Sequence, residues 1–195
     1  RRTALDGPLH PYTLTTRSHY ARDLRELGEY DASVEILREV RESFGHVLNP
    51  YVPEVLRVDK SLAVSLRRSG RLEEALHLSE QTWETHARYR DRYGRSIPEE
   101  LACGLNLAAD YFATDAEHGA RRAVQQVEEV LEGYRNSFGA EHPFTMFCIN
   151  NLATYYRALG DAQKAADLAE QAHTALAAAL GGDHPAALSA GTSLA

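Results

Sequence analysis

The stretch Asn151-Leu152-Ala153-Thr154-Tyr155-Tyr156, followed by Leu159-Gly160 and by Ala165, decides the fold of this chain. Leu152 and Tyr156 are large residues four positions apart, so they lie on one face of a helix. Gly160 suits the end of that helix, because glycine adopts a positive φ without strain. The small Ala165 lets a second helix approach the first closely. The stretch therefore predicts a helix, a tight turn and a second helix.

Three further copies of this pattern occur earlier in the chain. The residues that correspond to Leu152 are spaced by 42, 45 and 45 positions, and each precedes a small residue by 13 positions. A spacing of this length predicts a solenoid of stacked helix pairs. Loops that contain Gly and Pro separate the copies, and Pro suits the first turn of the helix that follows. The four pairs of large and small residues are Tyr20 with Ser33, Leu62 with Ala75, Leu107 with Ala120, and Leu152 with Ala165.

The repeat predicts an all-α fold of antiparallel helix pairs. First helices are expected near residues 11–27, 52–68, 98–114 and 143–159, and second helices near 30–43, 71–92, 117–137 and 162–180. The units run over about 11–50, 51–95, 96–140 and 141–182, with a partial fifth unit at 183–195, and together form one repeat domain over 1–195. Asp115 stands where the other turns have Gly, so this turn is expected to be longer or distorted. Because the chain starts with Arg1 and stops in mid-helix, we expect a fragment of a longer chain.

The composition is that of a globular protein. The 195 residues are 44% hydrophobic and 25% charged, with a net charge of −7, which disfavours bulk nucleic-acid binding. No apolar run is long enough for a membrane span, and no signal-peptide pattern is present. Two cysteines without disulfide spacing indicate a reducing compartment, so we expect a cytoplasmic protein.

The repeats resemble the tetratricopeptide repeats of the kinesin-light-chain type, in a form that looks bacterial. The resemblance covers nearly the whole chain, although unit two has Tyr51-Val52-Pro53 in place of His-Pro. It implies a right-handed superhelical solenoid that serves as a non-enzymatic scaffold and contacts ligands with its concave face, which the first helices line. The matching segments are His10-Pro11-Tyr12-Thr13-Leu14, His142-Pro143-Phe144-Thr145, Asn150-Asn151-Leu152-Ala153, Tyr156, Leu159-Gly160, Ala165 and Gly182-Asp183-His184-Pro185.

Motifs for chemistry are absent from the sequence. No phosphate-binding Gly loop, nucleophile elbow or His-Glu-x-x-His motif occurs, so we expect no catalytic residues, no cofactor and no metal. Cys103 and Cys148 occupy the same position of successive units, and helices stack about 8–10 Å apart, so they are interpreted as packing residues. His10, His142 and His184 belong to the inter-repeat turns, where a structural role accounts for them.

The concave face has a recognisable composition. Its expected positions lie five and two residues before the large repeat residue, and two and five after it. Units one and two supply cations there, which suit an acidic or C-terminal carboxylate segment. Units three and four supply apolar and polar residues, which suit a bulky apolar side chain and a peptide backbone. The predicted groove consists of Arg22, Arg25, Arg57, Lys60, Arg67, Leu105, Phe112, Phe147, Asn150 and Arg157, with Thr15, Ser18 and Val64 at equivalent positions.

These residues also have interpretations that involve no ligand. The arginines can be a solvated face, because exposed ion pairs contribute only about 0–1 kcal/mol each. Phe112 and Phe147 can equally pack between neighbouring helices. The favoured function is a scaffold that binds a protein or peptide partner. The alternatives are a regulatory or sensor arm of a larger signalling protein, nucleic-acid binding through the Arg-rich face, and a structural spacer. The sequence specifies neither the partner nor the oligomeric state.

Overall fold

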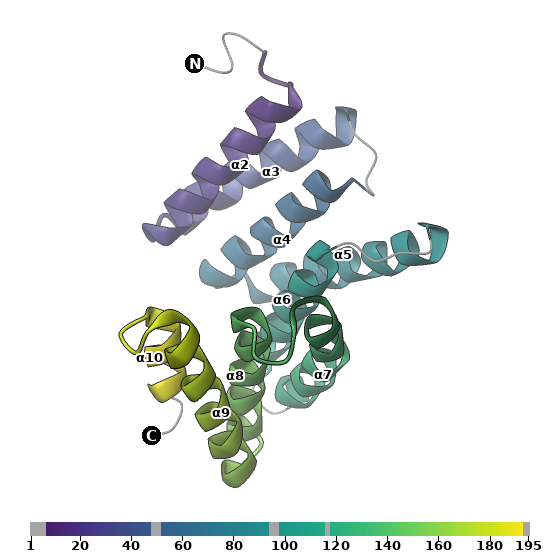
Figure 1. The fold of residues 1–195 in the computed structure, drawn as a ribbon. Coiled ribbons are helices and arrows are strands. Elements are labelled where there is room, and N and C mark those ends of the chain that lie inside the picture. The colour runs from purple at the N-terminus through teal and green to yellow at the C-terminus, as the bar shows by residue number, and fades with distance from the viewer. Residues whose placement is uncertain (1–6, 48–51, 94–97, 116–117, 193–195) are drawn as a thin grey trace. The chain divides into compact units, whose positions relative to one another are not determined.

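The computed structural model describes residues 7–47, 52–93, 98–115 and 118–192, which form nine helices and no strand (Figure 1). The all-α prediction is confirmed, and the observed helix bounds differ from the expected ones by at most four residues, at the end of α3. The helices are α2 (Pro11–Glu26), α3 (Tyr30–Val47), α4 (Pro53–Arg68), α5 (Leu72–Tyr93), α6 (Pro98–Thr114), α7 (His118–Phe138), α8 (Pro143–Ala158), α9 (Ala162–Leu180) and α10 (Pro185–Thr192). None of these described helices is both long and apolar enough to cross a membrane.

Glycine ends the first helix of three of the repeats, as predicted. Gly28, Gly70 and Gly160 have φ values of 87°, 82° and 82°. In each turn the residue after the glycine donates its N–H to a carbonyl five residues earlier, as in the 2.9 Å bond from Glu29 to Leu24. This bonding satisfies a carbonyl that the helix end would leave unpaired.

The third turn is built differently. Asp115 replaces the glycine, and its carboxylate accepts a 3.0 Å hydrogen bond from the backbone N–H of His118, the first residue of α7. Residues 116–117 lie outside the described residues, so the predicted lengthening of this turn stays a prediction.

The three His-Pro turns share one hydrogen bond. The Nδ1 atoms of His10, His142 and His184 accept from the N–H two residues later, at 3.3, 3.2 and 3.2 Å. Histidine thus caps the start of α2, α8 and α10, and the proline that follows occupies the first helical position, where no donor is needed. The structural role expected for these histidines is confirmed.

The chain divides into two compact units, Arg1–Asn106 and Leu107–Ala195, and the boundary falls within α6. In the first unit α3 packs against α2 and α4, and α4 packs against α5; in the second, α8 packs against α7 and α9, and α9 packs against α10. The small repeat residues are almost completely buried, with exposed fractions of 0% for Ser33, Ala75 and Ala120 and 1% for Ala165. Their small side chains permit the close helix approach that the pattern predicted.

Tyr20 departs from its repeat equivalents. The side chains of Leu62, Leu107 and Leu152 are 4%, 1% and 4% exposed, whereas Tyr20 is 57% exposed. No helix that the structure describes in the first unit covers this side of α2. A phenol tolerates such exposure because its hydroxyl remains hydrated.

Candidate functional site

The predicted groove positions of the first two repeats meet in a hollow between α2 and α4. Its volume is about 210 Å³. Most of the wall is formed by residues between Thr15 and Arg25 on α2 and between Arg57 and Val64 on α4. These residues include the positions that the sequence pattern predicted. The lining residues are Thr15, Ser18, His19, Arg22, Arg25, Phe44, Glu54, Arg57, Val58, Lys60, Ser61 and Val64.

Two cations of the hollow are held by neighbouring groups. Arg25 donates to the Ser61 carbonyl at 3.4 Å and pairs with Glu26 at 3.1 Å. Arg57 pairs with Glu99 at 3.0 Å and lies 3.7 Å from Glu54, one turn earlier on α4. These contacts hold the two guanidinium groups in place and neutralise part of their charge.

The other two cations have no such partner. Among the described residues, neither Arg22 nor Lys60 forms an ion pair. Arg22 projects from α2 and is exposed, whereas Lys60 projects from α4 and is half-buried. They are therefore the cations of the hollow that are available to a ligand.

Arg67 has a structural role instead. It does not line the hollow, and its guanidinium donates to Oδ1 of Asn106 at 3.1 Å. The amide nitrogen of Asn106 in turn donates to Ser79 Oγ at 2.9 Å. Arg67 thus links α4 to α6 through a largely buried polar network.

Sequence reasoning missed three polar residues of the hollow, Glu54, His19 and Ser61. Glu54 precedes Arg57 by three positions and so lies on the same helix face, a spacing that could have revealed it. No acid lies among the predicted groove positions, but the wall itself includes this carboxylate.

In the second unit the predicted groove residues lie on α6 and α8. Phe112 packs against Tyr155, with ring centroids 5.1 Å apart, so the packing interpretation holds for this residue. Phe147 is partly exposed, as is Asn150, whose buried Oδ1 lacks a hydrogen-bond partner among the described residues. Arg157 is exposed near the end of α8. Leu105, on the α6 segment of the first unit, is half-buried.

Phe147 borders a cluster of aromatic side chains near the start of α8. Phe144 lies 6.1 Å from Phe147, and it contacts Phe138 at 5.5 Å and His142 at 5.1 Å between ring centroids. Phe138 and Phe144 are 40% and 48% exposed. The pattern missed Phe144, although its position three residues before Phe147 places both on one face.

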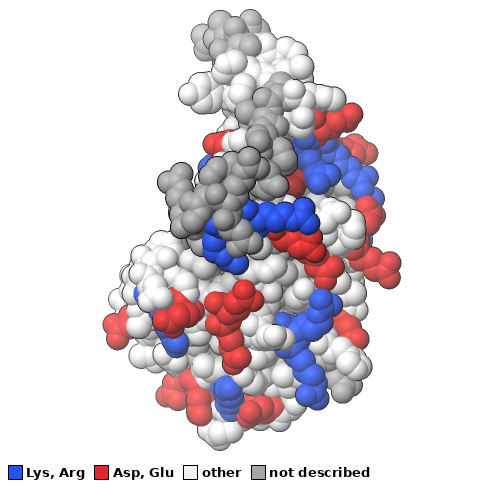
Figure 2. Space-filling view, turned by 90° about the vertical axis from the view of Figure 1, so that its right-hand side faces the viewer, with Lys and Arg blue, Asp and Glu red and all other residues white. Residues whose placement is uncertain are grey.

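Charges of both signs are interspersed on the face that Figure 2 shows. The hollow between α2 and α4 differs, because its lining includes four Lys or Arg residues and one carboxylate, Glu54. This local surplus is opposite in sign to the net charge of −7. An electropositive hollow favours binding of an anionic group.

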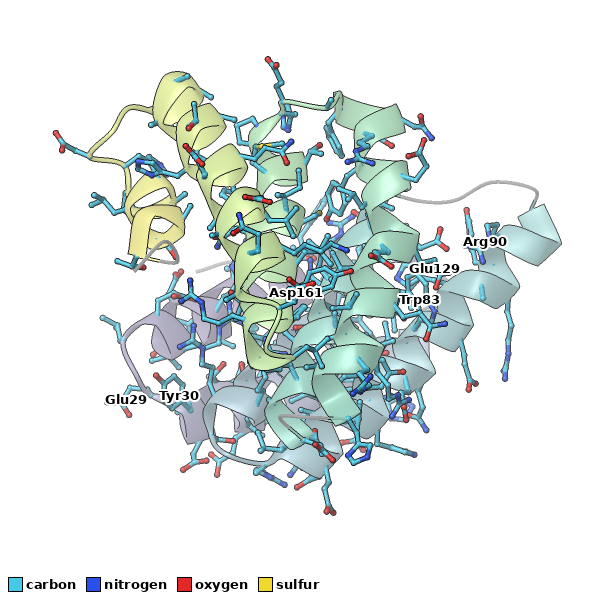
Figure 3. All side chains as sticks on the ribbon, turned by 90° about the horizontal axis from the view of Figure 1, so that it is seen from below. Glu29, Tyr30, Trp83, Arg90, Glu129 and Asp161 are labelled. Carbon is cyan, nitrogen blue, oxygen red and sulfur yellow. The ribbon has the colours of Figure 1, made fainter. Side chains whose placement is uncertain are left out.

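The first unit also contains a buried polar pair, and the charge of Lys60 acts on both of its members. His86 is 1% exposed, and its Nε2 lies 3.2 Å from Sγ of Cys103. Burial lowers the pKa of His86 to about 4 and raises the pKa of Cys103 to about 12. Both groups are thus neutral at pH 7, which does not suit a thiolate nucleophile. Near them on α5, Arg90 (Figure 3) forms an ion pair with the buried Glu100.

Cys103 and Cys148 are both buried and free. Burial also raises the pKa of Cys148 to about 12. Within the described ranges, no group of three or more His, Cys, Asp or Glu side chains is arranged to hold a metal ion.

Comparison with known proteins defines the class. Models of the tetratricopeptide repeat match residues 13–50 and 61–89, and residues 100–178, so the chain belongs to the tetratricopeptide-repeat family. Proteins with these repeats generally mediate protein–protein interactions, and the fold is typically a non-enzymatic scaffold. A comparison with curated proteins finds no match.

Solved structures define the type of repeat. The chain resembles a Podosopora anserina protein described as a kinesin light chain with nearly identical TPR-like repeats, at 28% identity and a TM-score of 0.76, over 95% of this chain and 85% of that chain. BtubC (BKLC) from P. vanneervenii shares the fold, with a TM-score of 0.79 at 18% identity, over 100% of this chain and 75% of that chain. The repeats are therefore of the kinesin-light-chain type.

Proposed function

We propose that this chain is a scaffold whose first unit binds an acidic segment of a protein partner in the hollow between α2 and α4. The observation that carries the proposal is that Arg22 and Lys60 lie on different walls of one hollow and form no ion pair with a described residue. Their carboxylate ligand is an Asp or Glu side chain or a C-terminal carboxylate. Arg25 and Arg57, already held by neighbouring groups, add positive potential without moving.

The second unit is proposed to take an apolar side chain of a partner. Phe144 and Phe147 present aromatic surface on α8, and Asn150 and Arg157 follow along the same helix. Exposed aromatic side chains are enriched among the residues that dominate binding energy at interfaces. Each unit makes this contribution by itself. We place the protein in the cytoplasm, where reduced thiols such as Cys103 and Cys148 are stable.

The test compares two variants of the whole chain. Arg22→Glu/Lys60→Glu reverses the two unpartnered cations, whereas Arg17→Glu/Arg68→Glu reverses one cation on each of the same helices outside the hollow. Both are first checked by circular dichroism. Fluorescence anisotropy then measures binding of an array of short acidic peptides with free or amidated C-termini.

The proposal predicts that some acidic peptides bind the wild type and the Arg17/Arg68 variant but lose at least about tenfold in affinity for the Arg22/Lys60 variant. Equal affinity for the two variants would show that acidic peptides bind elsewhere. A free C-terminus that improves binding would assign the anion to a terminal carboxylate.

Two alternatives make different predictions. A regulatory arm would contact another part of its own protein, so the isolated chain would bind no acidic peptide yet would bind its neighbouring domain. Nucleic-acid binding through the arginines would weaken steeply with salt and show little sequence preference.

A further inference from the structure

We propose that the hollow between α2 and α4 is a phosphoryl-binding pocket that takes the side chain of a phosphoserine or phosphothreonine in the partner. The inference rests on the proposed function, because it names the anion that the same hollow prefers. Phosphate, unlike a carboxylate, carries about −1.5 to −2 charges at pH 7 and three acceptor oxygens.

The hollow carries a surplus of positive charge. Arg25 pairs with Glu26, and Arg57 pairs with Glu99 and lies near Glu54, so their charges are largely compensated. Arg22 and Lys60 form no ion pair with any described residue, so they are the cations that a bound anion would meet. The four cations exceed the three carboxylates Glu26, Glu54 and Glu99 by one positive charge, so the net charge of the site favours an anion.

The directions of the donors also favour a tetrahedral ligand. Arg22 comes from α2 and Lys60 from α4, so the two cations reach the hollow from different walls. The two oxygens of a carboxylate lie in one plane and suit a single arginine fork. The three oxygens of a phosphoryl group allow a fork from one wall and an ammonium group from the other at the same time.

The size of the hollow limits what can enter it. Its volume of about 210 Å³ is enough for one phosphoryl group. The remainder of a peptide would therefore lie outside, along the surface of the first unit.

The surroundings of Lys60 favour a bound anion. Lys60 is half-buried, and the apolar side chains of Phe44, Val58 and Val64 share the lining with it. Partial burial removes some water from the ammonium group, and no described carboxylate lies within ion-pair distance of it. A bound anion would supply that partner.

A nucleic acid is the less favoured source of phosphate. Each phosphodiester carries one charge, and binding along a strand needs a stripe of cations rather than one hollow. The chain as a whole carries −7 and would repel a polyanion that extends beyond the hollow.

The experiment uses the whole ¹⁵N-labelled chain and follows amide resonances by NMR. The probes are N-acetyl-phosphoserine N-methylamide, N-acetyl-glutamate N-methylamide, inorganic phosphate and an eight-residue oligothymidylate. Each probe is titrated into the wild type, into Arg22→Ala/Lys60→Ala, and into the matched control Arg17→Ala/Arg68→Ala, which removes one cation from each of the same helices.

The phosphoserine derivative is expected to shift resonances of α2 and α4 and to bind at least about tenfold more tightly than the glutamate derivative. Arg22→Ala/Lys60→Ala should abolish this preference, and the control should retain it. Equal binding of the two derivatives would overturn the phosphoryl inference and leave the acidic-segment function standing. No shift at α2 and α4 with either derivative would overturn both. Inorganic phosphate that binds more tightly than the phosphoserine derivative would assign the site to free phosphate. Oligothymidylate that binds more tightly would assign it to nucleic acid. Either result would overturn the assignment to a phosphorylated protein.

Discussion

Replacing Gly119 by alanine should destabilise the second unit, although alanine is normally the better helix residue. Gly119 is the second residue of α7 and is buried. A β-carbon added there would lie 2.0 Å from the carbonyl oxygen of Tyr111 and 2.8 Å from its carbonyl carbon. Backbone atoms cannot rotate away as a flexible side chain can, so α7 would have to move away from Tyr111.

The size of the effect follows from two opposing terms. Overpacking of this kind costs typically 1–3 kcal/mol. Alanine returns up to about 1 kcal/mol through its lower backbone entropy, and less at a helix start than in the interior. The expected net loss is about 2 kcal/mol, which corresponds to a decrease in Tm of roughly 4–8 °C for a chain of 195 residues.

Gly45→Ala provides the matched control. Gly45 lies in α3 and is exposed, and a β-carbon added to it would meet no atom within 4 Å. The same substitution should therefore raise stability by about 0.5–1 kcal/mol. Urea unfolding followed by circular dichroism measures both variants. Equal shifts for Gly119→Ala and Gly45→Ala would refute the close approach of α7 to Tyr111.

Three further predictions concern buried and capping groups. His86→Leu should raise the free energy of unfolding by about 1 kcal/mol at pH 7, because it removes a buried imidazole whose Nδ1 lacks a partner among the described residues. Since burial lowers the pKa of His86 from 6.5 to about 4, the unfolded chain binds more protons below pH 6.5, and the wild type should lose about 2 kcal/mol more than the variant by pH 5 in urea titrations. The thiols of Cys103 and Cys148, whose pKa values burial raises to about 12, should react with Ellman's reagent only after unfolding. His142→Ala should cost about 1 kcal/mol through loss of the helix cap, and His142→Asp should recover most of it in the same unfolding assay.

Residue spacing predicted the fold because two helices must pack closely in every repeat. A small side chain is needed wherever two helices approach, so Ser33, Ala75, Ala120 and Ala165 could be found without a structure. Tyr20 shows the limit of this reasoning. Its place in the pattern suggested burial, but exposure depends on which helix covers it, and the repeat pattern alone does not specify that.

The sequence could predict where the candidate site lies, but not which of its cations pair with other residues. Helix periodicity placed Arg22, Arg57 and Lys60 on one surface. It could not show that Arg57 pairs with Glu99, 42 positions later, or that Arg67 bonds to Asn106, 39 positions later. Such pairs depend on how successive helices are set against one another and on side-chain rotamers. The structure therefore reduces the five cations predicted in the first two repeats to two, Arg22 and Lys60, that form no ion pair or hydrogen bond with a described residue.

The repeat also explains why the two units can present different chemistry on equivalent positions. Burial constrains the residues that pack between helices, such as Leu62 and Leu152, to be large and apolar. The positions five residues before them are among those that the pattern assigns to the groove, and core packing does not fix their type. Arg57 occupies this position in the first unit and Phe147 in the second. A substitution here can change what the surface binds while the helices stay in place, whereas the same exchange at Leu62 or Leu152 would disrupt the core.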